Sequence, residues 1–197
     1  MNREEIINIV ADLYEEYGIS ELGFSLKKFC NRAGILLIPY SSYGNESNKL
    51  KCFDEDGFNL INPESNHNEI YFNDEIRPLE RLKFTIPHEI GHICLGHNLC
   101  IGKSETRFQN REANIFANEF YCPQVLIIYF HLNTSSKLIS KFGITASYAE
   151  TLLSKIKERR SMEFSPAEKR LLNVFLKNQE DHLDNSSNRR IEWNFII

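Results

Sequence analysis

The chain has 197 residues, of which 42% are hydrophobic and 12% aromatic, and its formal net charge is −4. This length suits one domain, or one domain with a small appendage, and the apolar content is sufficient for a packed core. The acidic balance argues against a broad nucleic-acid-binding surface. No run of about 18 apolar residues predicts a transmembrane helix, and the N-terminal residues lack the apolar centre of a signal peptide. We therefore expect a cytoplasmic protein.

The first forty residues predict two helices and a strand. Apolar side chains recur at helical spacing over residues 3–17, which indicates an amphipathic helix. A second helix is expected over residues 25–33, with Gly34 as its stop signal. The short apolar run 35–38 is typical of a buried strand.

A small sheet is expected next. Residues 41–48 form a polar loop, and residues 51–61 predict a hairpin with its turn at residues 54–57. A further strand is expected over residues 69–73, and His67 in the loop before it is expected to be exposed.

The motif His88-Glu89-Ile90-Gly91-His92 stands within RLKFTIPHEIGHICLGH, residues 81–97. Residues four apart share one face of a helix, so both histidines can bind one metal ion. Two imidazoles leave room on zinc for a third protein ligand and a water, and Glu89 is placed to take a proton from that water. The alternative is a pair of solvated histidines beside a surface glutamate.

The surroundings of the motif support a helix, with one exception. Ile86, Ile90 and Ile93 follow a 3-4 spacing and should pack in the core. Gly91 would let another backbone approach closely. Pro87 disfavours helix at the residue before it, so the helix either starts near Pro87 or is kinked there.

A third ligand is expected from the segment REANIFANEFYCP, residues 111–123. Its inward stripe is Ala113, Phe116, Ala117 and Phe120. Glu112 borders this stripe and Glu119 follows one heptad later, with Glu105 as a weaker candidate in the preceding loop. Periodicity alone does not choose between them.

The two segments together resemble the ImmA/IrrE family of zinc metallopeptidases over roughly residues 25–125. That family has an R-x-x-F-T-x-x-H-E-x-G-H block, followed by an E-A-N-x-F-A block that closes with proline. The fitting residues are Arg81, Phe84, Thr85, His88, Glu89, Gly91, His92, Glu112, Ala113, Asn114, Phe116, Ala117 and Pro123. The chain departs from the pattern at Pro87 and in the polar run 119–122.

The resemblance implies a zinc-dependent endopeptidase with one Zn²⁺ per chain, held by His88, His92 and Glu112, and with Glu89 as general base. It also implies a protein substrate, a helix-turn-helix repressor of a phage or mobile element. The alternative is a DNA- or partner-binding regulator with a structural or vestigial metal site.

Four further residues are candidates for substrate contacts. An edge strand beside the metal commonly binds the substrate backbone in zinc peptidases. Tyr71 and Phe72 make the strand over residues 69–73 a candidate for this role. Tyr71, Tyr121 and His131 are candidates for the donor that stabilises the oxyanion.

The five cysteines contain no C-x-x-C pair, and we expect free thiols in a reducing compartment. Cys94, His97 and Cys100 lie close to the motif and could form a competing zinc site. Their spacing matches no common structural zinc arrangement, so the motif histidines are preferred.

The remainder of the chain predicts mainly helices. Residues 125–130 should be buried, and residues 136–157 resemble a helix-turn-helix. That segment could contact DNA, but packing on the peptidase core with a solvated basic face is favoured. A helix is expected from Pro166 to about Lys177, then a polar linker over 179–190. The apolar end, which includes Trp193, should dock as a strand or contact a partner.

These expectations combine into an α+β fold. It has a zincin-like metallopeptidase core, with a small mixed or antiparallel sheet packed on helices, and a C-terminal helix-turn-helix-like segment. The expected divisions are residues 1–133 for the peptidase domain, 134–178 for the helical segment, and 179–197 for the linker and tail.

Overall fold

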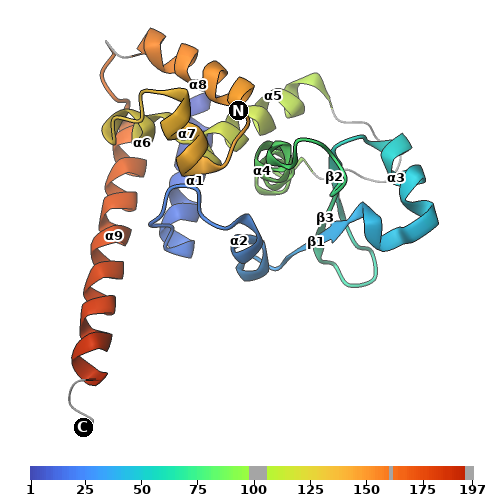
Figure 1. Ribbon diagram of the computed structural model, residues 1–197, viewed down its shortest axis with the longest axis horizontal. Helices are drawn as coiled ribbons and strands as arrows, with labels where there is room; N and C mark the ends of the chain where they lie inside the picture. Colours follow the sequence, from blue (N-terminus) through green and yellow to red (C-terminus); the bar gives the residue numbers. More distant parts are fainter. Residues whose placement is uncertain (98–105, 160–161, 194–197) are drawn as a thin grey trace.

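The computed structural model describes residues 1–97, 106–159 and 162–193, with side chains described as far as residue 184. The chain is mostly helical and carries one three-stranded mixed sheet, which confirms the expected α+β class. In Figure 1 the helix α4 (Leu82–Cys94) lies between the sheet and the helices α1 (Arg3–Tyr17) and α5 (Arg107–Tyr121). Both segments of the sequence motif are therefore central in the fold.

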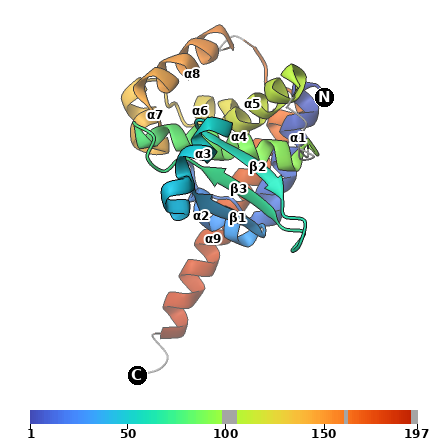
Figure 2. The same ribbon diagram turned by 90° about the vertical axis from the view of Figure 1, so that its right-hand side faces the viewer.

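The sheet has the order β1-β3-β2. The middle strand β3 (Asn68–Phe72) pairs in parallel with β1 (Ile35–Pro39) and antiparallel with β2 (Gly57–Ile61). Figure 2 shows the sheet from its open side, with β3 between its two neighbours. The strand that carries Tyr71 and Phe72 is therefore not an edge strand, and the expectation that it adds a substrate strand is wrong, because both of its hydrogen-bonding edges are occupied.

The prediction of a hairpin over residues 51–61 is correct for its second strand and wrong for its first. Its second strand is β2, but its first half belongs to α3 (Ser47–Phe53), which follows the 3-10 helix η1 (Tyr40–Glu46) in place of the expected polar loop. The turn itself is present, because Oδ1 of Asp54 accepts hydrogen bonds from the amides of Asp56 and Gly57. An Asx turn of this kind can follow a helix as well as a strand.

Two of the N-terminal elements match the expectations closely. Asn2 and Glu5 form a capping box at the start of α1, and Gly18 ends the helix in the left-handed conformation. Ser25 caps α2 (Leu26–Arg32) through the amide of Lys28. Side-chain hydrogen bonding at the helix starts explains why the boundaries were readable from the sequence.

The helix α4 starts at Leu82, one residue after the 3-10 turn η2 (Leu79–Arg81), and contains Pro87 in its interior. The helix start is therefore not at the proline. Ile86 and Ile90 are buried, as expected. Gly91 admits a close neighbour, but this is the ring of Phe116 in α5 rather than a backbone: a Cβ at Gly91 would lie 3.0 Å from Cδ1 of Phe116. Glycine thus allows α4 and α5 to pack tightly behind the histidines.

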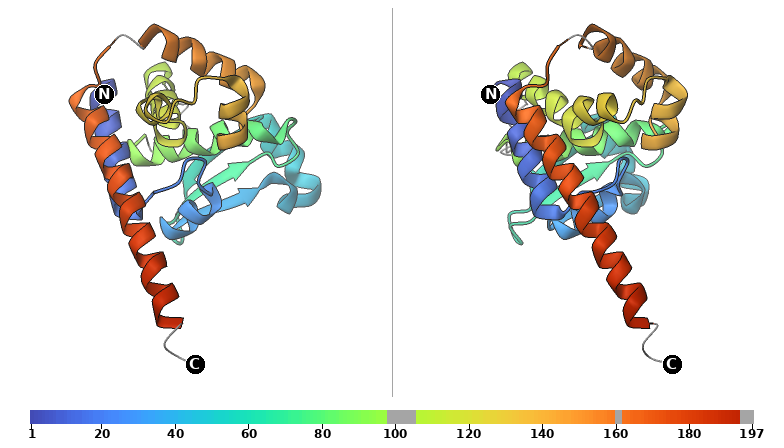
Figure 3. Two further views of the ribbon diagram at one scale, coloured as in Figure 1. Left: turned by 60° about the vertical axis from the view of Figure 1, so that its left-hand side comes forward. Right: turned by 90° about the vertical axis from the view of Figure 1, so that its left-hand side faces the viewer.

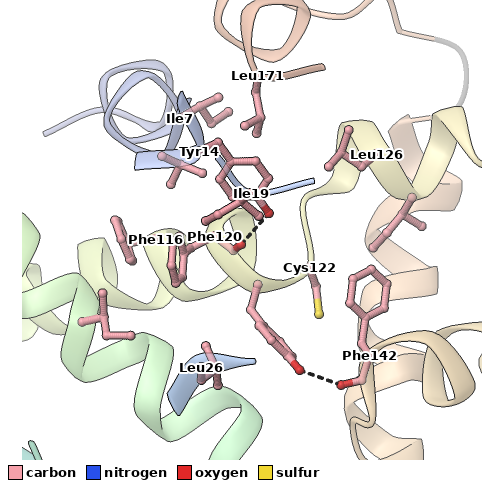
Figure 4. Packing of buried hydrophobic residues seen from close by; sticks show 14 of the residues in the cluster. Ile7, Tyr14, Ile19, Leu26, Phe116, Phe120, Cys122, Leu126, Phe142 and Leu171 are labelled. Carbon is pink, nitrogen blue, oxygen red and sulfur yellow. Dashed lines mark hydrogen bonds between the residues drawn. The ribbon is translucent and has the colours of Figure 1, made fainter. Parts of the chain in front are cut away.

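A single apolar core joins α1 and α5 to the C-terminal helices (Figure 4). Two buried tyrosines in this core form hydrogen bonds with backbone carbonyls. The hydroxyl of Tyr14 donates to the carbonyl of Phe120 at 2.8 Å, and the hydroxyl of Tyr121 donates to the carbonyl of Phe142 at 3.0 Å. The apolar run after Pro123 forms α6 (Gln124–Tyr129), and Val125 is fully buried, as expected.

The C-terminal part is helical over a longer range than expected. The helices α7 (Ser135–Phe142) and α8 (Ala146–Arg159) are joined by a turn at Gly143, and α9 runs from Pro166 to Trp193. The linker expected over 179–190 is therefore helix. Figure 3 shows α9 beside α1 and its last turns extending beyond the other elements. Residues 194–197 lie outside the described part, and no described helix is long and apolar enough to cross a membrane.

A buried ion-pair cluster holds α1, α5 and α9 together. Arg3 bonds to Glu119 at 2.6 Å and to Glu168 at 2.8 Å, and Arg159 bonds to the second oxygen of Glu168 at 2.7 Å. Both carboxylates are almost fully buried, with 1% and 0% exposure. Such a cluster contributes little net stability as a whole but is costly to break.

The cluster predicts a pH dependence of folding. Burial alone would raise the pKa of Glu168, but hydrogen bonds from Arg159, Ser165 and Arg3 outweigh it and lower that pKa from 4.5 to about 2. The stabilisation from ionised Glu168 is therefore complete above pH 4.5 and is lost as the pH falls towards 2. We expect urea midpoints of the Glu168→Gln variant to change less over this interval than those of the unmodified chain. Equal pH dependence of the two proteins would contradict this assignment.

Candidate active site

The two motif histidines converge on one point. His88 and His92 project from the same face of α4, and their Nε2 atoms lie 3.1 Å apart. Two imidazole nitrogens on a tetrahedral zinc ion would be roughly 3.3 Å apart, given Zn–N bonds of about 2.0–2.1 Å. The observed separation therefore fits two ligands of one metal ion.

Both rings are held in the neutral form. Burial lowers the pKa of His88, and burial together with the neighbouring histidines lowers the pKa of His92 to about 3. Neutral imidazole is the form that binds a metal, so no proton has to be displaced near pH 7. The buried Nδ1 atom of His88 has no hydrogen-bond partner among the described residues.

Glu89 lies beside the histidine pair and is 4% exposed. Its Oε2 atom accepts a 2.8 Å hydrogen bond from Nδ2 of Asn59, which is itself 3% exposed and belongs to β2. The sheet therefore orients the carboxylate that follows the first histidine. A carboxylate held in one position next to two metal-ligand nitrogens can act as a general base.

Asn59 is expected to be a positioning residue for Glu89. The Asn59→Ala variant removes the hydrogen bond to the carboxylate, so we expect kcat to fall about tenfold, because loss of orientation weakens general-base catalysis. KM should change less than twofold. Steady-state kinetics check this. Asn62→Ala, in the turn that follows β2, is the control. A kcat within twofold of the unmodified chain would contradict the role.

A second layer of polar contacts lies behind His92. Its Nδ1 atom is 3.3 Å from Nδ1 of His97, and Nε2 of His97 is 2.9 Å from Oε2 of Glu112. The other oxygen of Glu112 contacts the α-amine of Met1. Outer contacts of this type fix the orientation of a metal-binding imidazole. In this arrangement, Glu112 is linked to His92 through His97.

The donor set fits a metal only in part. The histidine nitrogens converge, but among residues 1–97, 106–159 and 162–193 no cluster of three or more His, Cys, Asp and Glu side chains surrounds a common point. Glu112 as third ligand stays a prediction. Glu119 is engaged by Arg3, whereas Glu105 and Cys100 lie outside the described residues.

A cleft of about 530 Å³ lies between α4, α5 and α8, and its described lining does not include His88, Glu89 or His92. Phe84, whose ring lies 6.0 Å from that of His88, and Asn114 belong to its wall. The opposite wall comes from α8, where Tyr148 contacts Phe84 edge to face at 5.4 Å between ring centroids. The full lining consists of Asp56, Glu80, Arg81, Phe84, Thr85, Asn114, Asn118, Thr145, Tyr148, Thr151 and Lys155.

The remaining candidates for substrate contacts lie elsewhere. The hydroxyl of Tyr71 donates to Glu69 at 2.8 Å, and Phe72 ends the central strand. Tyr121 is 1% exposed, and its hydroxyl donates a hydrogen bond to the carbonyl of Phe142. It is therefore not available as an oxyanion donor. His131 is exposed in the turn after α6, where its carbonyl accepts from Lys137.

Sequence reasoning missed two residues of the site. Asn59 is a buried amide in a strand, and its place between two apolar residues was a usable signal, because an inward polar side chain needs a partner. His97 was considered only with Cys94 and Cys100. Its distance of five residues from His92 does not place it on the same helical face, and its contact depends on the turn at Gly96 that ends α4.

The model of one protein family, Peptidase_M78, described as the IrrE N-terminal-like domain, matches residues 30–154. The matched range extends from the end of α2 into α8 and includes the histidine pair, Glu89, the sheet and α5. Neither the curated proteins nor the solved structures gave a match.

Proposed function

The chain belongs to the ImmA/IrrE family of metallopeptidases, and from this premise we propose that it is a metal-dependent endopeptidase that acts at His88, Glu89 and His92. The observation that carries the proposal is the convergence of two neutral imidazole nitrogens 3.1 Å apart beside a buried carboxylate. Two solvated surface histidines would not have pKa values lowered by burial.

Zinc is the proposed metal, with one ion per chain, because imidazole is a favoured zinc ligand. His88 and His92 would hold it. When bound, it would lower the pKa of a coordinated water and polarise the scissile carbonyl.

Glu89 is proposed to move the protons of the reaction. It accepts a proton from the water that attacks the carbonyl carbon, so that a C–O bond forms. It then delivers this proton to the amide nitrogen as the C–N bond breaks and the amine leaves. The hydrogen bond from Asn59 supports this role, because it holds the carboxylate in a fixed position.

The edge strand β2 supports a peptide as substrate. It lies next to α4 and carries Asn59, which touches Glu89. An extended chain that pairs with the outer edge of β2 would pass along the catalytic helix. This assigns to β2 the role that sequence reasoning gave to the next strand.

For the substrate itself, we propose a helix-turn-helix repressor of a phage or mobile element. The family resemblance is the support for this choice. The alternative, a DNA- or partner-binding regulator, would use the basic face of α8. Against it, α8 packs on α4 and α5: Tyr148 contacts Phe84 and donates to Asn118 at 2.9 Å, and Lys155 belongs to the lining of the cleft between these helices.

Incubation with a repressor encoded beside this chain tests the proposal. With added zinc, we expect one internal cut, detected by intact-mass spectrometry, and its loss on addition of a chelator. An uncut repressor, combined with a DNA mobility shift that weakens steeply with salt, would favour the regulator instead.

A further inference from the structure

The three-stranded sheet has one face against α4 and one face turned away from it. Side chains alternate between the two faces along a strand. Asn59 and Ile70, which are paired in register, point towards α4, because Asn59 bonds to Glu89 and Ile70 is fully buried. The opposite face, seen in Figure 2, carries two rows of three residues in register, and we call these six residues the outer sheet face: Leu36, Glu69 and Leu60, then Ile38, Tyr71 and Phe58.

The outer sheet face is largely apolar and partly accessible to solvent. Leu36 is 48% exposed, and the ring of Tyr71 stacks on that of Phe58, with 5.0 Å between the centroids and 3° between the planes. Two exposed rings extend this stack: Phe53 of α3 lies 4.7 Å from Phe58, and Tyr43 of η1 lies 6.0 Å from Tyr71. An exposed apolar patch with aromatic rings is typical of protein-binding surfaces.

Glu69 is an acidic residue within this apolar face. It is 5% exposed, and its register partners on both neighbouring strands are leucines. Its two oxygens accept hydrogen bonds from Nδ2 of Asn62 and from the hydroxyl of Tyr71, both at 2.8 Å. Both donors are neutral, and no lysine, arginine or histidine of the described residues forms an ion pair with Glu69. Because buried carboxylates are generally paired, Glu69 is suited to a cation from another molecule.

The part of the chain around this face is strongly acidic. Residues 46–80, which include α3, β2 and β3, contain nine Asp and Glu residues and three Lys and Arg residues, a formal net charge of −6. The whole chain has a net charge of −4, so the other residues together have +2. Glu64 lies in the turn that follows β2, and Asp74 bonds to Ser41 of η1. A surface of this sign attracts cationic segments and repels nucleic acid.

We propose that the outer sheet face is a docking surface for an apolar segment of a partner protein that carries arginine, with the guanidinium bound to Glu69. The proposal goes beyond the peptidase function and does not rest on it, because this surface is on the side of the sheet that faces away from α4.

The chemistry of the face fits arginine better than lysine. A guanidinium can offer two parallel N–H donors to a carboxylate and can also stack on a tyrosine ring, which an ammonium group does less well. An ionised carboxylate has about four lone-pair positions, and Asn62 and Tyr71 each use one of those of Glu69. The alkyl stem of arginine and its aliphatic neighbours would cover Leu36 and Leu60.

Peptide binding to the full-length chain tests the proposal in the presence of a chelator, so that no metal contributes. The probe is a fluorescein-labelled peptide of alternating leucine and arginine. Its matched control has citrulline, the neutral analogue of arginine, at each arginine position. We expect the arginine peptide to bind at least tenfold more tightly than the citrulline peptide, measured by fluorescence anisotropy at an ionic strength of about 0.15 M.

Two variants locate the arginine site. Glu69→Gln should reduce the preference for arginine to less than threefold. Glu64→Gln removes the same charge from the exposed turn and should leave the preference within twofold of its original value.

A third variant controls for loss of fold in Glu69→Gln. Leu36 is 48% exposed and pairs with Glu69 in register, so Leu36→Lys places a competing ammonium group beside the carboxylate without opening the core. The preference should fall below threefold while the circular dichroism spectrum stays unchanged. If Glu69→Gln does not fold, Leu36→Lys decides alone.

The proposal is supported if the preference is lost in the folded variants at Glu69 and Leu36 and kept in Glu64→Gln. Equal losses in Glu64→Gln and Glu69→Gln would overturn it in favour of a general attraction by the acidic surface. Equal binding of the two peptides to the unmodified chain, or no binding of either, would also overturn it. None of these results changes the proposed peptidase function, which is tested separately by zinc binding at His88 and His92.

Discussion

Replacement of Glu89 by glutamine is expected to reduce kcat about a thousandfold while the chain retains its zinc. Glutamine keeps the shape of the side chain and can still pair with Asn59, but it cannot accept the proton of the attacking water. General acid–base catalysis contributes about a hundredfold to ten-thousandfold in rate. Rate measurements on the cleaved repressor and metal analysis of the same sample check both parts of the expectation.

The exposed carboxylate Glu64 provides the matched control. Glu64→Gln makes the same chemical change in the turn between β2 and β3 and should leave kcat unchanged. Cleavage by Glu89→Gln within tenfold of the unmodified rate would rule out Glu89 as the general base. Loss of zinc from this variant would indicate that the carboxylate is needed to maintain the site.

Arg3→Ala is expected to destabilise the fold by about 3 kcal/mol, which is typical for the removal of one partner from a buried ion pair. Burial already raises the pKa of Glu119 even though Arg3 opposes this shift. Without the guanidinium, Glu119 is left as an uncompensated charge or must take up a proton. Urea unfolding at pH 7, followed by circular dichroism, measures the change.

Arg170 is the matched control for Arg3. It also joins α9 to α1, but its partners Asp12 and Glu15 are exposed to solvent, with side-chain exposures of 62% and 58%. Exposed pairs contribute about 0–1 kcal/mol, so Arg170→Ala should lower stability by less than about 1 kcal/mol. Equal losses in the two variants would show that burial does not determine the cost of breaking the Arg3 cluster.

Two of the helices that begin with a side-chain cap could be predicted from the sequence. Ser25 and the Ser165-Pro166 pair marked the starts of α2 and α9, because capping is a local interaction. The histidine pair was also readable, since residues four apart on one helix necessarily share a face. In each case, the information lies within a few consecutive residues.

The predictions that proved wrong concern features that depend on contacts between distant segments of the chain. The position of β3 in the centre of the sheet is determined by β1, about thirty residues earlier, and no local pattern marks a strand as central or edge. The interpretation of 51–61 as a hairpin failed because helix and strand periodicity are not distinguishable over so short a run. The side of α5 that faces the histidines depends on where α1 packs. The C-terminal part of α9 resembles a linker in sequence because it has few apolar residues.

The central claim is that His88 and His92 form a metal site, and zinc stoichiometry tests it most directly. We predict about one zinc per chain in protein purified without chelator and supplied with zinc, and none in His88→Ala or His92→Ala samples whose circular dichroism shows a folded chain. No bound zinc in the unmodified chain, or an unchanged stoichiometry in both folded variants, would contradict the claim.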